Sequence, residues 1–145
     1  MAVTAFVYGN GLVHITDADL DWTVDTIKVS LHTVSYVPSQ DADDFWNDAT
    51  NEITGTGYTA EGQTLTTPTR TYTGGTNTLS LDADNAVWTS SSFTARIAVV
   101  YKDRGGATSA DELFSYVDFG GDETVSSGTF TIQWHTDGVI KIVAS

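Results

Sequence analysis

The sequence predicts an all-β protein, a β-sandwich or jelly-roll-like single domain with one or two short helices. Its 145 residues, 40% of them hydrophobic, are enough for one core. Short segments of alternating apolar and polar residues, rich in threonine, are separated by turn signals about every eight to twelve residues. Residues 1–145 contain no internal repeat and no linker, so we expect them to form one domain.

The first strand is predicted at residues 26–32, where apolar and polar residues alternate cleanly. Ile27, Val29 and Leu31 share one face of this strand. The other face carries polar residues, among them His32, and we expect it to be solvated. A half-buried strand results, with its apolar face on the core.

Two helices are considered. Residues 1–20 are predicted to form either an N-terminal arm or a short helix, because Gly9 and Gly11 weaken the helical spacing of their apolar residues. A second short helix is predicted over residues 41–51. Asp41 can cap it, and further aspartates fall in its first turn.

The middle of the chain predicts a series of strands. Pro68 lies inside the first of them and indicates an edge position or a break. Residues 94–102 are apolar on both faces, which favours a central strand or one that borders a partner. The strands are predicted at residues 63–73, 78–82, 86–88, 94–102 and 113–119.

The end of the chain predicts a hairpin, for which two registers are possible. A two-residue turn at residues 137–138 would place Ile140 on the face opposite Trp134. A three-residue turn with a left-handed Gly138 pairs Trp134 with Ile140 and Ile132 with Ile142. The second register is preferred because it gives one apolar face. The expected core therefore includes Ile27, Val29, Leu31, Ile97, Val99, Ile132, Trp134 and Ile140.

The net charge of the chain limits the classes of partner that it can bind. Nineteen acidic residues against six basic ones give a net charge of −13. Nucleic acid and anionic membranes would repel such a chain, so neither is an expected partner. The abundant aspartates serve turns and caps or, alternatively, keep a protein soluble in salty water. No cysteine is present, which excludes disulfides and cysteine metal sites, and residues 1–20 resemble neither a secretion signal nor a membrane helix.

Metal ligation is weakly indicated. Asp17, Asp19 and Asp21 have the spacing that opens a calcium loop, but Trp22 stands where an EF-hand needs glycine. A looser calcium site at these aspartates is the alternative to turn and cap roles. The three histidines, His14, His32 and His135, lack zinc-site spacing, and we expect His32 and His135 to be solvated.

No pattern singles out a catalytic residue, and we expect neither an enzyme nor a cofactor. A nucleophile elbow is absent, and no pair of carboxylates is distinguished. The aromatic residues offer an alternative, a platform on which sugars stack. Core positions are the better interpretation for Trp88 and Trp134, whereas Tyr36 and Tyr58 lie next to turns and are expected to be exposed.

Several motifs recur in a fixed order along the chain. Residues 21–31 read D-W-x-x-D-T-I-K-V-x-L, and residues 52–65 read E-x-x-G-x-G-Y-T-x-x-G-x-x-L. V-x-Y-K-D, Y-V-D-F-G and F-T-I-Q-W…G follow within residues 98–103, 116–120 and 130–138. In this order the motifs resemble a family of small structural proteins of tailed phages.

The resemblance implies a virion protein, most simply a capsid decoration or cement protein. Such a protein would bind the major capsid protein on the outer capsid surface and form a homo-oligomer, with a trimer favoured. The rival functions are a tail or fibre component with a receptor-binding role, and a carbohydrate-binding module. Because chain ends are ordered only where something holds them, we expect residues 1–6 to reach a neighbouring subunit. The candidate partner contacts are Met1, Ala2, Val3, Phe6, Tyr36 and Tyr58.

Overall fold

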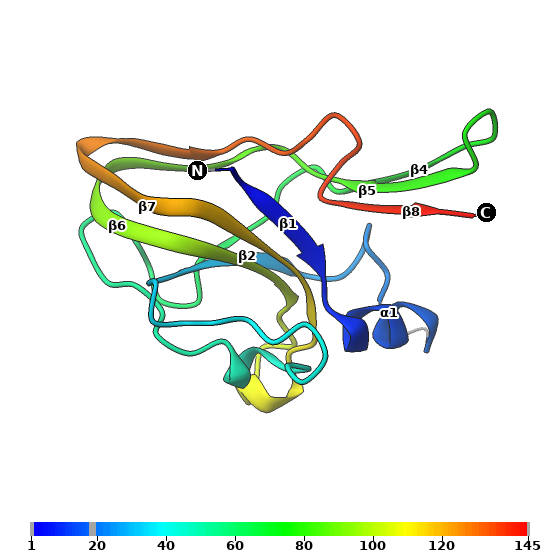
Figure 1. Ribbon diagram of the computed structural model, residues 1–145, viewed down its shortest axis with the longest axis horizontal. Helices are drawn as coiled ribbons and strands as arrows, with labels where there is room; N and C mark the ends of the chain where they lie inside the picture. Colours follow the sequence, from blue (N-terminus) through cyan, green and yellow to red (C-terminus); the bar gives the residue numbers. More distant parts are fainter. Residues whose placement is uncertain (1, 18–19, 145) are drawn as a thin grey trace.

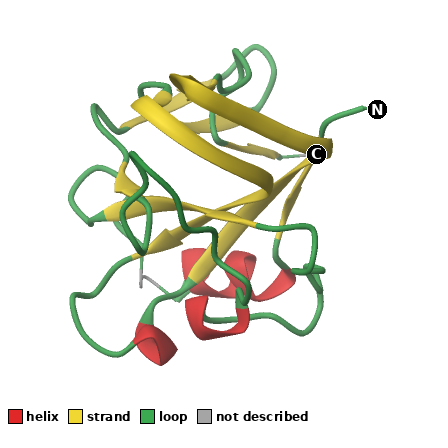
Figure 2. Cartoon of the chain, turned by 90° about the vertical axis from the view of Figure 1, so that its left-hand side faces the viewer, coloured by secondary structure: helices red, strands yellow, loops and turns green. Residues whose placement is uncertain are grey.

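The computed structural model describes residues 2–17 and 20–144, and within them two antiparallel sheets and short helical segments (Figure 1). A five-stranded sheet has the order β1-β7-β6-β2-β3, and a three-stranded sheet the order β4-β5-β8. The predicted all-β fold is therefore confirmed. Figure 2 shows the helical segments together at one end of the strands. The elements are β1 Thr4–Val7, α1 Gly9–Thr16, β2 Ile27–His32, η1 Trp46–Asp48, β3 Gln63–Thr64, β4 Thr69–Thr73, β5 Thr78–Asp82, β6 Ala86–Lys102, η2 Thr108–Ala110, β7 Leu113–Ile132 and β8 Ile140–Val143.

A long ribbon of β6 and β7 forms the centre of the fold. The two strands pair from Ala86↔Ile132 to Tyr101↔Leu113, with several irregularities in register. The separately predicted strands at residues 86–88 and 94–102 are thus parts of one strand, and the strand predicted at 113–119 continues to Ile132. β6 is central, as expected, because β2 and β7 flank it and both of its faces are buried from residue 97 to residue 101.

Two hydrophobic clusters lie on opposite faces of the five-stranded sheet. The larger contains Val29, Leu31, Ile132 and Ile140, and the smaller contains Ile97 and Val99 with several tyrosines. Seven of the eight expected core residues are buried. Trp134 is the exception: it packs against the larger cluster while remaining half-buried, because its indole Nε1 donates to the Asp84 carbonyl near the surface, 3.0 Å away.

The N-terminal segment forms both a strand and a helix. β1 pairs with β7, from Thr4↔Asp118 to Val7↔Ser115, at one edge of the five-stranded sheet. α1 follows and packs against β7. Gly11 is buried there: a Cβ at this position would lie 2.8 Å from the Phe114 carbonyl oxygen. Glycine weakens a helix, but here the absence of a side chain at Gly11 lets α1 approach the sheet closely.

The helix predicted over residues 41–51 is wrong. Only the single 3₁₀ turn Trp46–Asp48 forms there. Phe45 is extended and pairs with Glu112, and the Trp46 amide donates to the Asp111 carbonyl 2.7 Å away. These long-range backbone bonds take the groups that a helix would need.

The predicted C-terminal hairpin is also wrong in its pairing. Ile132 pairs with Ala86, whereas Ile140 pairs with Leu81 in the other sheet. A tight turn does exist, since the Gly138 amide donates to the His135 carbonyl 2.9 Å away and Gly138 has a φ of 98°. Its flanks then diverge to different sheets, and each isoleucine still reaches the larger cluster.

The break expected at Pro68 is confirmed. The predicted strand at 63–73 divides into β3, in the five-stranded sheet, and β4, in the three-stranded sheet. Register places Tyr72, Leu79 and Ile142 in one row across the smaller sheet. No helix in the described part of the chain is long and apolar enough to cross a membrane.

Candidate interaction surface

A serine and a histidine of β2 lie in contact on the face that was expected to be solvated. Ser30 and His32 are fully buried, so that expectation is wrong. Ser30 Oγ lies 2.9 Å from His32 Nε2, and His32 Nδ1 lies 2.8 Å from the Thr50 carbonyl oxygen. A carbonyl only accepts, so Nδ1 carries the hydrogen and Ser30 donates to Nε2. The sequence signal for this pair is the i, i+2 spacing on one strand face.

This pair has the form of a nucleophile beside an oriented base, but it is enclosed. Trp46 Nε1 donates to Ser30 Oγ over 2.9 Å, and the indole covers this face together with Tyr36. Burial lowers the pKa of His32 to about 4, although the bond to the Thr50 carbonyl opposes the shift. The pair is therefore neutral and lies in the protein interior.

Two tyrosines that were expected to be exposed belong to the interior. Tyr36 is only 3% exposed. Its hydroxyl lies 2.7 Å from that of Tyr8 and donates to Asp43 Oδ2 over 2.8 Å. Burial raises the pKa of both phenols. The expected exposure of Tyr36 is therefore wrong.

Tyr58 is half-buried against Trp88 and Phe93. Its hydroxyl accepts from the Leu31 amide over 3.0 Å and donates to Glu52 Oε1 over 2.6 Å. Burial raises the pKa of Glu52, while the bond from Tyr58 opposes that shift. Tyr58 thus holds the loop that contains Glu52 against β2. It was expected to be exposed, but it is only partly exposed.

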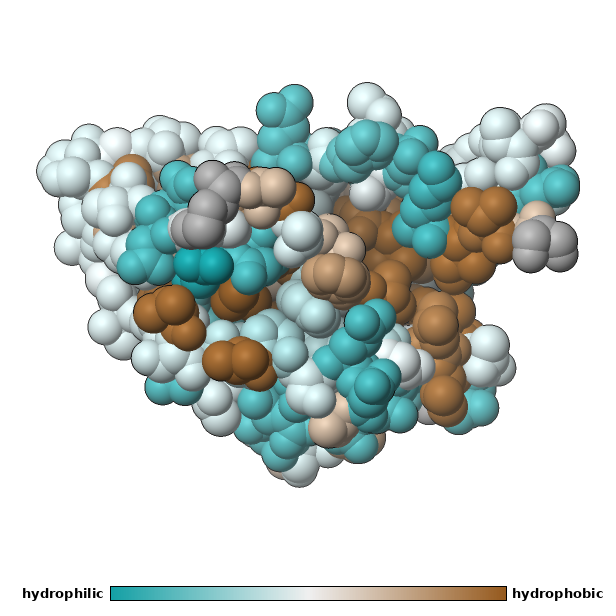
Figure 3. Space-filling model, viewed as in Figure 1, coloured by the Kyte–Doolittle hydropathy of each residue, from teal (hydrophilic) through white to brown (hydrophobic). Residues whose placement is uncertain are grey.

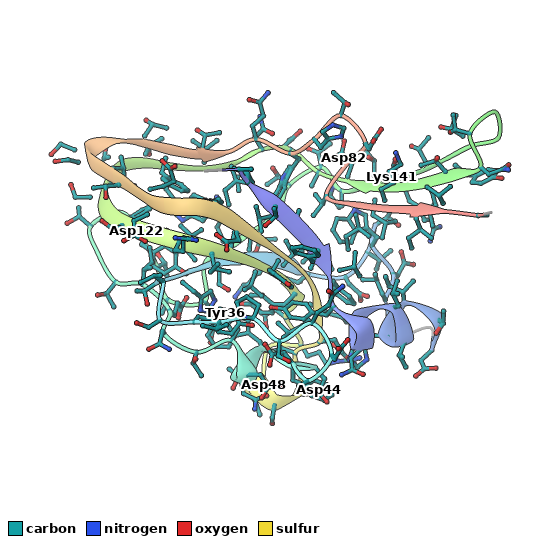
Figure 4. All side chains as sticks on the ribbon, in the orientation of Figure 1. Tyr36, Asp44, Asp48, Asp82, Asp122 and Lys141 are labelled. Atoms are coloured by element: carbon teal, nitrogen blue, oxygen red, sulfur yellow. The ribbon has the colours of Figure 1, made fainter. Side chains whose placement is uncertain are left out.

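Asp44 and Asp48 form a carboxylate pair that the sequence did not distinguish. They lie side by side at one end of the molecule (Figure 4), and the Asp44 amide donates to Asp48 Oδ2 over 3.2 Å. Burial, and then the neighbouring Asp48, raise the pKa of Asp44. The hydrogen bond between these two residues stabilises the loop that contains them, so we assign the pair a structural role.

The aspartates considered for calcium are only partly described. Asp17 follows α1 and is exposed, and Asp19 lies outside the described residues. Asp21 Oδ1 accepts from the side chain and the amide of Thr23, and these bonds lower the pKa of Asp21. Asp21 therefore has the turn role. Within residues 2–17 and 20–144, no three His, Cys, Asp or Glu side chains gather as a metal site would require.

The other histidines differ in exposure. His135 is exposed, as expected, with Asp137 beside it. His14 is half-buried in α1 against Phe45, and its Nε2 has no hydrogen-bond partner among the described residues.

Four of the ten large apolar side chains that are exposed in the described part of the chain lie near the N-terminus. Val3 and Phe6 of the β1 segment are 62% and 43% exposed, and Leu12 and Val13 of α1 are 47% and 49% exposed. We call these four residues the N-terminal surface, which extends over both sides of β1, because Val3 lines the groove on one side and Phe6 the groove on the other. Ala2 is also exposed, and Met1 lies outside the described residues. Figure 3 shows hydrophobic side chains around a hollow between β1, α1 and the three-stranded sheet.

Two grooves flank β1. One has a volume of about 420 Å³ and is lined by Val3 together with Phe119, Val125 and Phe130 of β7. The other, about 240 Å³, lies between β1 and the segment that leads into β8. The N-terminal strand therefore stands between two concave, partly apolar surfaces.

Charge is absent from this part of the chain. Residues 1–16 contain no Asp, Glu, Lys or Arg, although the whole chain has a net charge of −13. The segment itself is uncharged and apolar, although Asp118 of β7 pairs with Thr4 beside it, and apolar surface on an acidic protein is suited to contact another protein. No protein-family model, curated protein or solved structure matches the chain.

Proposed function

We propose that this protein is a structural component of a tailed-phage virion that decorates the outer face of the major capsid lattice and stabilises the particle. The resemblance of its ordered motifs supports this function. The observation that carries the proposal is the N-terminal surface, where exposed apolar residues meet a segment of 16 residues without charge.

Stabilisation would come from binding alone. A ligand that binds only the assembled lattice stabilises it by mass action. The N-terminal surface would contact the major capsid protein, and the acidic remainder would face water, away from the packaged DNA. A homo-oligomer would repeat these contacts around a symmetry axis.

The buried polar groups support a binding role rather than chemistry. Ser30 and His32 are enclosed beneath Trp46, and the Asp44–Asp48 pair braces a loop. We therefore propose neither a catalytic residue nor a cofactor. The sugar platform has little support, because Trp22 and Trp88 are buried and Trp46 and Trp134 are half-buried.

Phage particles that lack the protein test the function directly. We expect them to assemble but to lose DNA at a lower temperature, and we expect complete particles to contain hundreds of copies. A handful of copies per particle, or robust particles that fail to adsorb to cells, would instead indicate the tail or receptor-binding role.

A matched pair of variants tests the proposed contact surface. Val13→Asp should weaken binding to capsids that lack the protein, because it places a charge in the apolar contact. Val87→Asp is the control, since Val87 has similar exposure, 42%, on a different element. Equal capsid occupancy of the two folded variants would show that α1 is not the contact.

A further inference from the structure

The long strand β7 turns back on itself and leaves a groove between its two halves (Figure 1). Residues between 117 and 125 line one wall of this groove, residues 129–133 line the other, and Val3 of the N-terminal surface also lines it. Its volume of about 420 Å³ falls within the range of about 300–1,000 Å³ that is usual for binding pockets. We call it the β7 groove.

The apolar side chains of the β7 groove are held by the hydrophobic core behind them. Phe119 and Phe130 meet edge to face with ring centroids 5.9 Å apart, and Phe130 also contacts Trp88 and Phe93. Val125 is half-buried against the larger cluster, as both of these phenylalanines are. The groove therefore presents aromatic and aliphatic surface that buried neighbours fix in place.

One carboxylate lies on the apolar face of this strand. Glu123 pairs with Ala95 and Val125 pairs with Phe93, so all four side chains share the face that covers the larger cluster. Glu123 is exposed, lines the groove, and makes no hydrogen bond or ion pair with residues 2–17 and 20–144. A partner that fills the groove therefore removes water from an unpaired carboxylate.

This carboxylate determines which kind of side chain suits the groove. An apolar side chain would remove water from Glu123 and return no charge, which is unfavourable. A cationic side chain would form an ion pair with Glu123, and its aliphatic stem would lie along Val3 and Val125. Arginine suits the site better than lysine, because its planar guanidinium binds a carboxylate with two hydrogen bonds and stacks on aromatic faces such as that of Phe119.

The charges near the groove also favour a cation. Asp122 precedes Glu123 and is exposed, and Asp118 pairs with Arg96 over 2.6 Å. Three carboxylates and one guanidinium leave two negative charges on this part of the sheet. A second copy of this chain, which has six basic residues against nineteen acidic ones, is a poor source of the cation.

We propose that the β7 groove takes an arginine side chain of the major capsid protein, whose guanidinium pairs with Glu123 and stacks on the aromatic rings of the groove. This inference rests on the proposed function and names the chemistry of the partner at one point of contact. Val3 belongs both to the N-terminal surface and to the lining of the groove, so one partner would cover both.

Titration of the isotope-labelled full chain with short capped peptides, followed by NMR, tests the groove without a capsid. Acetyl-Gly-Arg-Gly-amide should shift the amide resonances of Glu123, Val125 and Thr131, which line the groove. The matching citrulline peptide has nearly the same shape without the charge and should bind about fivefold more weakly or less. Glu123→Gln should weaken binding of the arginine peptide by a similar factor. Equal binding of the two peptides to the parent protein, or of the arginine peptide to parent and variant, would overturn the inference.

Binding to capsids that lack the protein identifies the source of the arginine. Glu123→Gln should raise the dissociation constant about fivefold or more, with thermal melting as the check on folding. Asp122→Asn is the control, since it removes the same charge from an exposed neighbour that does not line the groove. Equal capsid binding by both variants and the parent would overturn this inference alone. A parent that binds the arginine peptide but no capsid would overturn the capsid protein as the source and the proposed function with it.

Discussion

The two sheets of this protein are covered to different extents. The five-stranded sheet has a hydrophobic cluster on each face, and even its polar Ser30 and His32 are enclosed. The three-stranded sheet buries only part of one face, and all five residues of its strand β4 are exposed. Figure 1 shows this smaller sheet projecting past the body of the molecule, with α1 below it.

This difference indicates where stability resides. Free energy of folding depends on area removed from water, so residues of β2 and β6 should contribute most. The outer part of the small sheet should open most easily, because few of its groups are buried. Matched substitutions in the two sheets test this contrast.

Leucine truncation should show the largest contrast. Leu31→Ala removes a fully buried side chain from β2 and should cost about 2–5 kcal/mol of unfolding free energy. Leu79→Ala, at a half-buried position in β5, should cost clearly less. Urea denaturation measures both values. Equal losses would mean that the small sheet is as firmly packed as the large one.

The dependence of stability on pH should show the next largest effect. The pKa of His32 is lowered to about 4, below the ordinary value of 6.5, so the unfolded chain binds the proton more readily. The contribution of neutral His32 is complete above pH 6.5 and is lost as pH falls towards 4, by about 3 kcal/mol at most. The unfolding free energy of His32→Gln, measured by denaturation at several pH values, should lack the part of the pH dependence that His32 contributes. The exposed His135 serves as control, and a slope that His135→Gln reduced equally would contradict this assignment.

Removal of a tyrosine hydroxyl should show the smallest contrast. Tyr58→Phe removes the hydroxyl that accepts from the Leu31 amide and one of the two hydrogen bonds to Glu52 Oε1, the other coming from the Glu61 amide, and should cost about 1–3 kcal/mol. Tyr72→Phe in β4 removes an exposed hydroxyl that donates to Asn77 Oδ1 and should change stability by less than about 0.5 kcal/mol. Thermal melting of the two variants measures the difference, and similar melting temperatures would show that Tyr58 contributes no more than a surface residue.

Predictions from sequence succeeded where local patterns of residues determine the structure. The fold class, β2, β5 and the break at Pro68 follow from local patterns and are confirmed. The apolar face of β2 was identified because alternation reports which residues share a face. Alternation does not report whether a distant loop covers the polar face. The burial of Ser30 and His32 depends on Trp46, which is 14 residues away from His32 in the chain.

The errors share a physical cause. The hairpin at residues 130–142 was predicted from local register, but β8 pairs with β5, more than fifty residues earlier in the chain. The helix predicted at residues 41–51 lost its backbone groups to Asp111 and Glu112. Of the candidate contacts, Val3 and Phe6 are exposed, whereas Tyr36 is buried by tyrosine packing that no local pattern reports.

The position of β1 has a consequence for how the chain is made. Thr4 pairs with Asp118, so β1 is synthesised 114 residues before the part of β7 that it pairs with. At typical rates of translation this interval is on the order of ten seconds. During that time an uncharged, apolar strand has no sheet to join, and such strands are the ones that aggregate. Synthesis therefore exposes β1 to other nascent chains before the fold can protect it.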